Sequence, residues 1–361
     1  MREPYTQVNT NAPEPEFQLT VITVCWNALA ELKPTVESVL AQKARGSISI
    51  EHLVVDGAST DGTPEWLAGQ LAAGNIERYV SEPDRGIYDA MNKGINLARG
   101  RVLAFLNAGD CYRADADLAA CVLPICRGEA ESVAATAVMV PPDSSEPPYD
   151  WTAAGFRDSL FIGCPCCHQA YFASARAYRA AGGYRAQEFR CGADFDVICR
   201  ITAAQGLPAV SACRAVDFAI GGYSYDNLSR FADEYAQIMA DNWRLLLRRA
   251  QEEPEYGQLL AARVALLSSK LGEWQAHRVA QAPRAARQLG AMCTSLLRTQ
   301  CRWPVPAALL WLKWLHLPWV AHGRGVPAPL RRITRLAYRA CGLQQGSPYL
   351  ALAYRGADVW G

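Results

Sequence analysis

Three aspartates of this sequence stand where buried strands would end, at positions suited to ligand chemistry. Asp56 follows HLVV, Asp84 follows RYVSEP, and Asp110 follows AFLNAG. No glycine-rich phosphate loop of the G-x-G-x-x-G or G-x-x-x-x-G-K-[S/T] kind accompanies them. A carboxylate repels a phosphate unless a divalent cation joins the two. This combination favours a diphosphate bridged through a metal ion over one that backbone amides cradle.

Asp110 is the only acid in the turn from Asn107 to Asp110, so it either holds a metal ion or merely starts the next helix. One carboxylate, two phosphate oxygens and waters form a workable shell for Mg²⁺ or Mn²⁺, which often keep several waters. We therefore expect Asp110 to hold Mg²⁺ or Mn²⁺, weakly in the free protein and well when a diphosphate ligand is bound.

The elements that position these acids follow from short apolar runs that alternate with helical patterns between Leu19 and about Val140. This alternation predicts parallel strands joined by crossover helices, the front half of a nucleotide-binding α/β domain. Ligands of such sheets bind beyond the carboxyl ends of the strands, which places the acids at a crevice. The expected strands are 19–25, 50–56, 76–81, 101–107 and 133–140, and the expected helices are 34–42, 64–71 and 87–97.

The helix expected over 87–97 carries both an apolar face and a charged pair. Ile87, Met91 and Ile95 recur at helical spacing and are expected to face the sheet. Asp89 and Lys93 are four residues apart, a spacing typical of a solvated ion pair. Because their helix begins at the expected crevice, the same two side chains would also reach a ribose or a diphosphate. The spacing is compatible with both interpretations.

His168 follows Cys164, Cys166 and Cys167, a grouping that suggests zinc. A structural zinc site usually needs two pairs of ligands, and the nearby sequence adds only Cys191. We therefore expect ordinary buried cysteines here and no zinc. The chain has 13 cysteines in all, an odd number that cannot pair completely within the chain and that favours a reducing cytosol.

Six motifs in this order resemble the inverting family 2 glycosyltransferases with a GT-A fold, a Rossmann-like mixed sheet that binds nucleotide-diphospho-sugars. The resemblance is greatest to the bacterial exopolysaccharide branch with colanic-acid-type transferases, and it covers about residues 19–225. The motifs are LTVITVCWNALAELKPTVESVLAQ, HLVVDGASTDGT, SEPDRGIYDAMNKGI, AFLNAGD, CPCCHQAYF and GADFDVICR.

The resemblance implies a nucleotide-sugar site with residues in stated roles. Asp56 would accept a hydrogen bond from the base of the donor, with Thr23 and Asn27 in the same pocket, and His168 would flank the donor phosphates and the acceptor. Asp56 and Ser59 also suit a simple turn, with Asp61 capping the next helix. The expected donor-binding residues are Thr23, Asn27, Asp56, Ser59, Asp84, Gly86, Asp89, Lys93, Asn107 and His168.

An inverting transfer also needs a base that takes the proton of the acceptor hydroxyl. In the wider family this base is the second acid of a Glu-Asp pair. Ala193 replaces the first acid here, so Asp194 is the matching position and Asp196 the reserve. Both acids open a predicted helix, where they would also stabilise the helix dipole.

The expected activity is a metal-dependent, inverting transfer of a sugar from a nucleoside diphosphate to a hydroxyl of a lipid-linked glycan, in cell-surface polysaccharide synthesis. Two alternatives remain open. A sugar nucleotidyltransferase has a related sheet but needs a basic, glycine-rich loop, which Cys25-Trp26-Asn27-Ala28 is not. An inactive glycan- or nucleotide-binding scaffold fits the thinned acidic motifs, with Asn107 and Ala193 where acids often stand.

Charge divides the chain into two parts. From Lys270 onward, 13 Lys and Arg accompany only Glu273 and Asp358, a net of +11, whereas the first 269 residues carry a net of −10. We expect a flexible leader over 1–17, with no secretion signal, a GT-A catalytic domain over 18–226, and a mostly helical, basic region over 227–361.

The stretch 303–322 has nearly the length of a membrane span but contains Lys313, His316 and three prolines. Its four tryptophans and the arginines that follow suit a helix in the interface of an anionic membrane, and a helix packed on the catalytic domain is the alternative. We expect a cytoplasmic protein, peripheral on the inner face of the cytoplasmic membrane. No nucleic-acid-binding module accompanies the basic charge.

Overall fold

The computed structural model describes residues 15–142, 147–160 and 164–221, together with the single positions 234, 238, 241, 245 and 249. The predicted leader up to residue 14, the stretch 303–322 and nearly all of the predicted basic region lie outside the described residues. Within the described part of the chain, no helix has the length and apolarity that crossing a membrane requires. The boundary expected at residue 226 stays a prediction.

The first half of the sheet consists of four parallel strands in the order β3-β2-β1-β4. The strand predictions for this half are confirmed to within a few residues at each end. β2 is buried along its whole length, as its nearly continuous apolar run predicts for a strand covered on both faces. The strands are β1 (Phe17–Cys25), β2 (Ile50–Asp56), β3 (Arg78–Ser81) and β4 (Gly100–Phe105).

The second half of the sheet is mixed and continues from β4 in the order β8-β6-β9-β5, with β7 paired to β6. β8 runs antiparallel to both β4 and β6, so β6, expected among the parallel strands, is separated from β4 by a strand that comes later in the chain. The strands are β5 (Cys111–Tyr112), β6 (Ser132–Val140), β7 (Tyr149–Trp151), β8 (Tyr171–Ser174) and β9 (Ala209–Ala219).

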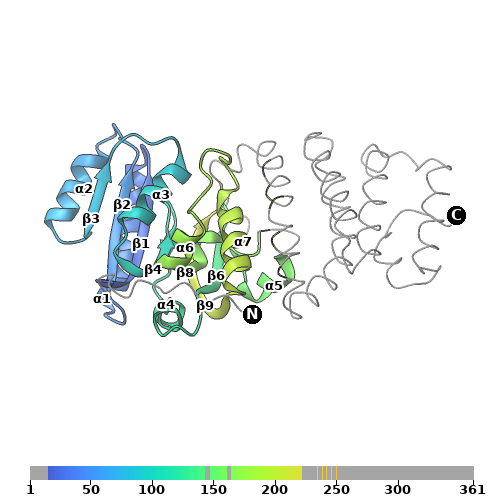
Figure 1. Cartoon of the computed structure of the whole chain (residues 1–361). Coiled ribbons are helices and arrows are strands. Elements are labelled where there is room, and N and C mark those ends of the chain that lie inside the picture. Colours follow the sequence, from blue (N-terminus) through green and yellow to red (C-terminus); the bar gives the residue numbers. More distant parts are fainter. Residues whose placement is uncertain are drawn as a thin grey trace, which may run out of the picture.

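Helices cover both faces of the sheet (Figure 1). Side chains of α3, α6 and α7 share one apolar cluster with β1, β2 and β4. Side chains of α1 and α4 share a second cluster on the opposite face. The helices are α1 (Leu29–Ala44), α2 (Thr63–Ala72), α3 (Ile87–Leu97), α4 (Ala119–Cys126), α5 (Phe156–Ser159), α6 (Ala175–Ala180) and α7 (Ala193–Gln205), with short 3-10 helices η1 (Ala153–Gly155) and η2 (His168–Ala170).

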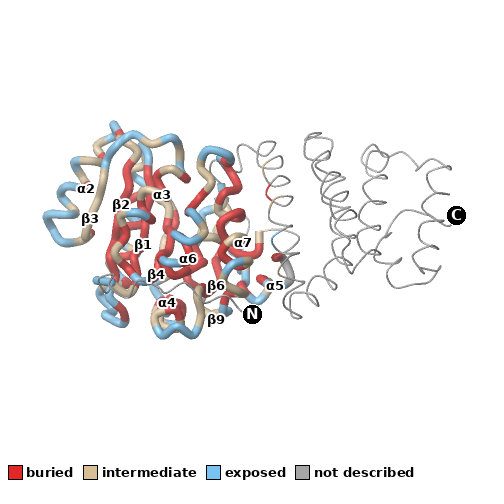
Figure 2. The backbone as a smooth tube through the Cα atoms, viewed as in Figure 1, coloured by how far each residue is buried: buried red, intermediate tan, exposed pale blue. Residues whose placement is uncertain are grey.

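Burial is concentrated in the strands between these helix layers (Figure 2). Strand alternation divides β1 between the two clusters, because Ile22 and Val24 belong to one and Leu19 and Val21 to the other. Burying apolar area on both faces contributes about 25 cal/mol per Å². The central strands are therefore a rigid base from which the loops at their carboxyl ends project.

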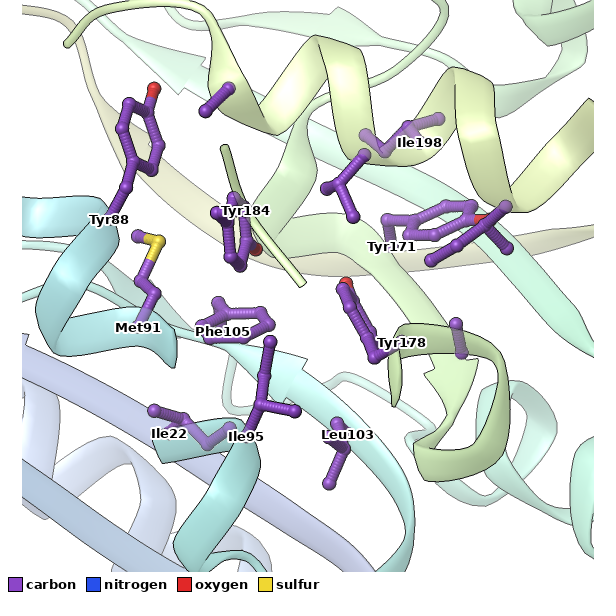
Figure 3. Close-up of a cluster of buried hydrophobic side chains, with 14 of the residues drawn as sticks. Ile22, Tyr88, Met91, Ile95, Leu103, Phe105, Tyr171, Tyr178, Tyr184 and Ile198 are labelled. Atoms are coloured by element: carbon purple, nitrogen blue, oxygen red, sulfur yellow. The ribbon is translucent and has the colours of Figure 1, made fainter. Parts of the chain in front are cut away.

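The apolar face of α3 is shifted by one residue from the predicted face. Met91 and Ile95 face the sheet as expected, but Ile87 is 39% exposed and Tyr88 is buried in its place. Tyr88 and Met91 project from α3 toward Tyr184 and Phe105 (Figure 3). The Tyr88 and Tyr184 rings stack with centroids 5.4 Å apart, and this aromatic packing fixes the start of α3 beneath the ligand-binding end of the sheet.

Candidate functional site

A cavity of about 710 Å³ opens at the carboxyl ends of β1 and β4, beside the start of α3. Trp26, at 69% exposed, and Ile87 contribute apolar surface to its wall. Asp84, Asp89 and the guanidinium-bearing Arg190 are charged members of the same wall. A flat aromatic ring beside acids and a cation suits a ligand that has both a planar ring and polar or anionic groups.

The acids of this wall hold the start of α3. Asp84 Oδ1 accepts the Gly86 N–H at 2.8 Å, and Asp89 Oδ2 accepts the Arg85 N–H at 3.0 Å. The backbone hydrogen bond from Arg85 is the main reason that the pKa of Asp89 is lowered. Gly86 has φ +120°, a conformation that favours glycine, and an added Cβ would lie 2.9 Å from Arg190.

Lys93 does not form the predicted pair with Asp89. Its Nζ donates to the Pro83 carbonyl at 2.8 Å and lies 3.0 Å from Glu82 Oε1, whereas Asp89 pairs with Arg85. Lys93 is not among the residues that line the cavity. The structure therefore gives Lys93 a role in fixing the loop that precedes α3.

Asp56 is completely buried at the end of β2 and does not line the cavity. Its carboxylate accepts the Ser59 N–H at 3.0 Å and the Ser81 hydroxyl at 2.6 Å, and the Ser59 hydroxyl also donates to it. Cys25 does line the cavity, and its Sγ lies 3.7 Å from Asp56 Oδ1. Asp56 and Ser59 thus form the turn that the sequence also allowed, directly behind the cavity wall.

Thr23 and Asn27, both expected in the nucleotide pocket, are absent from the cavity lining. Thr23 is fully buried and its hydroxyl lies 2.9 Å from His52 Nε2. Val24 and Cys25, which are nearer the carboxyl end of β1, line the cavity instead. Asn27, at φ +48°, accepts the Thr60 N–H at 2.8 Å and so ties the loop after β1 to the loop after β2.

Asp61 bridges the starts of two helices. Its Oδ1 accepts the Thr63 N–H and hydroxyl at 3.1 and 2.6 Å, and its Oδ2 accepts the Leu29 N–H at 2.9 Å. The hydrogen bond from the Thr63 hydroxyl is the largest contribution that lowers the pKa of Asp61. This geometry gives Asp61 the capping role expected from the sequence.

A hydrogen-bonded chain of four polar side chains joins the two halves of the sheet next to the cavity. Asp194 Oδ2 lies 3.3 Å from His168 Nδ1, and Asp194 Oδ1 accepts the Tyr88 hydroxyl at 3.0 Å. His168 Nε2 lies 3.4 Å from Asn107 Nδ2. Asn107 and Tyr88 both line the cavity, so the pair of Asp194 and His168 is one side chain away from it.

The environment of Asp194 keeps its carboxylate ionised. Burial raises the pKa of Asp194, but the hydrogen bond and charge of His168 and the hydrogen bond from Tyr88 outweigh burial, and the net shift is downward. A neutral His168 protonated on Nδ1 would donate to Asp194 and accept from Asn107. The ionised carboxylate is the form of Asp194 that can receive a proton from a hydroxyl group.

Asp196 has a different environment although it starts the same helix. It is fully buried, and its carboxylate lies 2.6 Å from Arg185 and 2.7 Å from Arg200. Two guanidinium groups leave it poorly placed to take a proton. The geometry gives Asp196 a role as an internal ion pair and leaves Asp194 as the candidate base.

Asp110 is 6% exposed and lies outside the cavity lining. Its Oδ1 accepts the Ala219 N–H at 2.9 Å, and its Oδ2 accepts a hydrogen bond from Gln169 Nε2. Burial raises the pKa of Asp110 to about 6. Both carboxylate oxygens thus serve the protein itself, and the residues that the structure describes contain no group of three His, Cys, Asp or Glu that could hold a metal. The donor set does not fit the metal site predicted at Asp110.

The start of α7, which carries Asp194, is braced by residues beyond the catalytic motifs. Glu234 Oε2 accepts the N–H groups of Arg190, Cys191 and Gly192 at 2.8, 2.7 and 3.3 Å. Ile238 is fully buried, and a Cβ added at Gly192 would lie 2.7 Å from it. The loop that presents Arg190 to the cavity is therefore fixed at its backbone.

Three residues of the site were not predicted from the sequence. Trp26 stands directly after a predicted strand, which is a signal for a ligand-facing position. Tyr88 lies three residues before Met91, so helical spacing could have placed it in the apolar face. Arg190 has no local sequence signal, because the loop before α7 brings it to the start of α3, where its guanidinium donates to the Arg85 carbonyl.

Comparisons with known proteins agree with this architecture. The family described as Glycosyl transferase family 2 matches residues 20–179. An uncharacterized glycosyltransferase of Mycobacterium tuberculosis is 44% identical over 103 residues, which are 28% of this chain and 36% of that protein. A PGL/p-HBAD biosynthesis glycosyltransferase of Mycobacterium bovis is 32% identical over 185 residues, which are 50% of this chain and 68% of the relative. The chain thus spans about a third of the first relative and two thirds of the second.

A solved structure shares the fold across most of the chain. The crystal structure of S. aureus TarS 1–349 in complex with UDP is similar with a TM-score of 0.59 at 14% identity, over 90% of this chain and 91% of that chain. At this identity the likeness concerns the fold, which is GT-A. The predicted α/β fold class is confirmed.

Proposed function

Because this chain belongs to glycosyl transferase family 2, we propose that it transfers a sugar from a nucleoside diphosphate to a hydroxyl of a glycan, with inversion at the anomeric carbon. The observation that carries this proposal is the cavity bordered by Trp26 and Arg190, with the hydrogen-bonded pair of Asp194 and His168 beside it. One part suits a nucleotide and the other suits proton removal.

The donor would lie with its base on the exposed face of Trp26. Stacking of a base on an aromatic side chain contributes about 1–3 kcal/mol, and Trp26 needs no rearrangement to offer its ring. Asp84 can accept hydrogen bonds from ribose hydroxyls or from an N–H edge of the base, whereas both oxygens of Asp89 already accept hydrogen bonds from Arg85. Arg190 supplies a cation in the same wall for the diphosphate. UDP is the ligand of TarS, which supports a nucleoside diphosphate here.

Asp194 is the proposed general base. It would take the proton from the acceptor hydroxyl as that oxygen bonds to the anomeric carbon and the bond to the diphosphate oxygen breaks on the opposite face. His168 and Tyr88 hold the two carboxylate oxygens in one orientation, which reduces the entropy lost on reaching the transition state. Asp196 takes no part in this step.

The departing diphosphate gains negative charge, which Mg²⁺ or Mn²⁺ bound to its two phosphates would neutralise. We propose that such an ion accompanies the donor. Asp110 is not proposed as its ligand, since both of its oxygens already accept hydrogen bonds from Gln169 and Ala219. Among the described residues that line the cavity, Arg190 supplies positive charge for the leaving group.

The proposed acceptor is a lipid-linked glycan of an exopolysaccharide of the colanic-acid type, used at the cytoplasmic face of the membrane. This part of the proposal rests on the motif resemblance and on the net charge of +11 after residue 269. Full-length protein should co-sediment with vesicles that contain anionic lipid at low salt and be released at high salt. Failure to co-sediment at low salt would end the membrane part of the proposal and leave the transfer reaction intact.

The transfer reaction is tested with a panel of nucleotide sugars, with and without Mn²⁺ or EDTA, by measuring release of the nucleoside diphosphate. The product linkage, read by NMR, should have the anomeric configuration opposite to that of the donor. Asp194→Asn should lower turnover by about 10²-fold or more, whereas the surface variant Asp150→Asn, which breaks only an ion pair with Arg214, should match the wild type. Donor binding without turnover across the panel would instead identify a binding scaffold.

A further inference from the structure

Asp110 lies at the point where four separate segments of the site meet. Its carboxylate accepts hydrogen bonds from Gln169 in η2 and from the Ala219 amide at the end of β9. Its carbonyl accepts the Thr35 hydroxyl of α1 at 2.8 Å, and its N–H donates to the Asn107 carbonyl at 3.0 Å. These contacts connect the turn after β4, which carries Asn107, with η2, which carries His168, so they join two neighbouring members of the polar chain around Asp194.

Gln169 transmits this connection to His168. The Gln169 side chain is fully buried, with its Nε2 donating to Asp110 and its Oε1 accepting the Cys167 thiol at 3.1 Å. A side chain fixed at both ends of its amide holds the backbone of η2. His168 precedes it directly and reaches between Asn107 and Asp194.

We infer that Asp110 is a positioning residue, which sets His168 against Asp194 through Gln169, and not a ligand of the metal. This inference rests on the proposed function, because it assigns how the proposed base is oriented. A metal ligand must direct a lone pair at the metal ion that accompanies the nucleotide sugar. Asp110 lies outside the cavity lining, and both of its oxygens accept hydrogen bonds from the protein.

Gln169 donates and Asp110 accepts in the hydrogen bond between them, so the inference can be tested by exchanging the two roles. Gln169→Glu places a second carboxylate against Asp110 in a buried position, where two like charges repel strongly. Adding Asp110→Asn to that variant restores a donor facing an acceptor: the new amide N–H₂ donates to the new carboxylate. The amide oxygen still accepts the Ala219 N–H, and the second carboxylate oxygen still accepts the Cys167 thiol.

The experiment compares wild type, Asp110→Asn, Gln169→Glu and the double variant in full-length protein. We expect Gln169→Glu to lower kcat by roughly tenfold or more with little change in donor KM, and the double variant to regain most of that loss. Mn²⁺ binding in the presence of UDP, measured by titration calorimetry, should have the same Kd in wild type and Asp110→Asn. A ligand role predicts the reverse, with turnover and Mn²⁺ binding lost whenever Asp110 is replaced and no rescue of Gln169→Glu.

Measurements on the same four proteins can also give two other results. If kcat is unchanged in all four folded proteins and only their unfolding free energies differ, Asp110 is structural and the positioning role is wrong. If wild type turns over no donor, the proposed function fails, while the unfolding free energies and the Mn²⁺ titrations still measure the coupling of Asp110 to Gln169 and its independence from metal. A folded double variant beside an unfolded Gln169→Glu would itself establish that coupling.

Discussion

Replacing Tyr88 with Phe should move the acid limb of the pH profile without disturbing the fold. The substitution removes only the hydroxyl that donates to Asp194 Oδ1 at 3.0 Å, and the ring can keep its stack with Tyr184. A hydrogen bond to a charged group contributes about 1.5–3 kcal/mol, and one pKa unit corresponds to about 1.4 kcal/mol. Loss of the bond should therefore raise the pKa of Asp194.

The sign follows from the charged form that the bond stabilises. Tyr88 and His168 lower the pKa of Asp194 against the effect of burial, so removing one of them favours the protonated acid, which cannot act as a base. The limb of kcat/KM on the acid side should shift to higher pH, with a loss relative to wild type that grows as the pH falls and disappears toward alkaline pH. Kinetics over pH 4.5–8.5 with a saturating acceptor would measure the shift.

Tyr184→Phe is the matched control, because it removes a hydroxyl from the same stack and leaves the bond from Tyr88 to Asp194 in place. Its acid limb should coincide with that of wild type. If Tyr88→Phe lowers kcat/KM by the same factor at every pH, Asp194 is not the titrating base and the mechanism proposed above is wrong. Thermal unfolding of both variants would check that the stack persists.

Three more outcomes follow from contacts of single residues. Burial lowers the pKa of His52 to about 3, so the contribution of His52 to the free energy of unfolding should be constant above about pH 6.5 and fall by about 2 kcal/mol at pH 5. Urea unfolding of wild type and His52→Gln at both pH values should show this loss as the difference between the two proteins. Trp26→Ala should raise donor KM by about 5- to 150-fold with a smaller change in kcat, and an unchanged KM in initial-rate kinetics would remove the stacking role. Asp196→Asn leaves Arg185 and Arg200 without their buried carboxylate and should destabilise the fold by about 3–5 kcal/mol, while the acid limb of the folded fraction stays in place.

The fold could be predicted where burial imposes a pattern on the sequence. β2 is buried on both faces, and its sequence is a nearly continuous apolar run. The observed bounds of α3, Ile87–Leu97, equal the predicted range 87–97. The position of β8 beside β4 could not be read in this way, because its pairing joins residues about 70 positions apart. The face of α3 was misplaced by one residue, since a buried Tyr beside an exposed Ile contradicts simple hydropathy.

For the candidate site, the positions of the loops could be predicted from the sequence, but the directions of several side chains could not. The sequence located the loops after β1, β3 and β4, because parallel strands deliver their carboxyl ends to one edge. Side-chain direction could not be predicted for Thr23 and Asp110, since a shift of one position along a strand or turn moves a polar group from the cavity to the interior. The pairing of Tyr88 with Asp194 spans 106 positions and depends on a tertiary contact between the starts of α3 and α7.

The contacts of Glu234 have a practical consequence for shortened forms of this protein. Glu234 supplies the acceptor for three consecutive amides before α7, and Ile238 covers Gly192. A chain trimmed to residue 226 would keep every sequence motif but lose this brace from the helix that carries Asp194. Cleavage before Glu234 should therefore lower turnover more than cleavage after Ile238, because only the first removes these contacts.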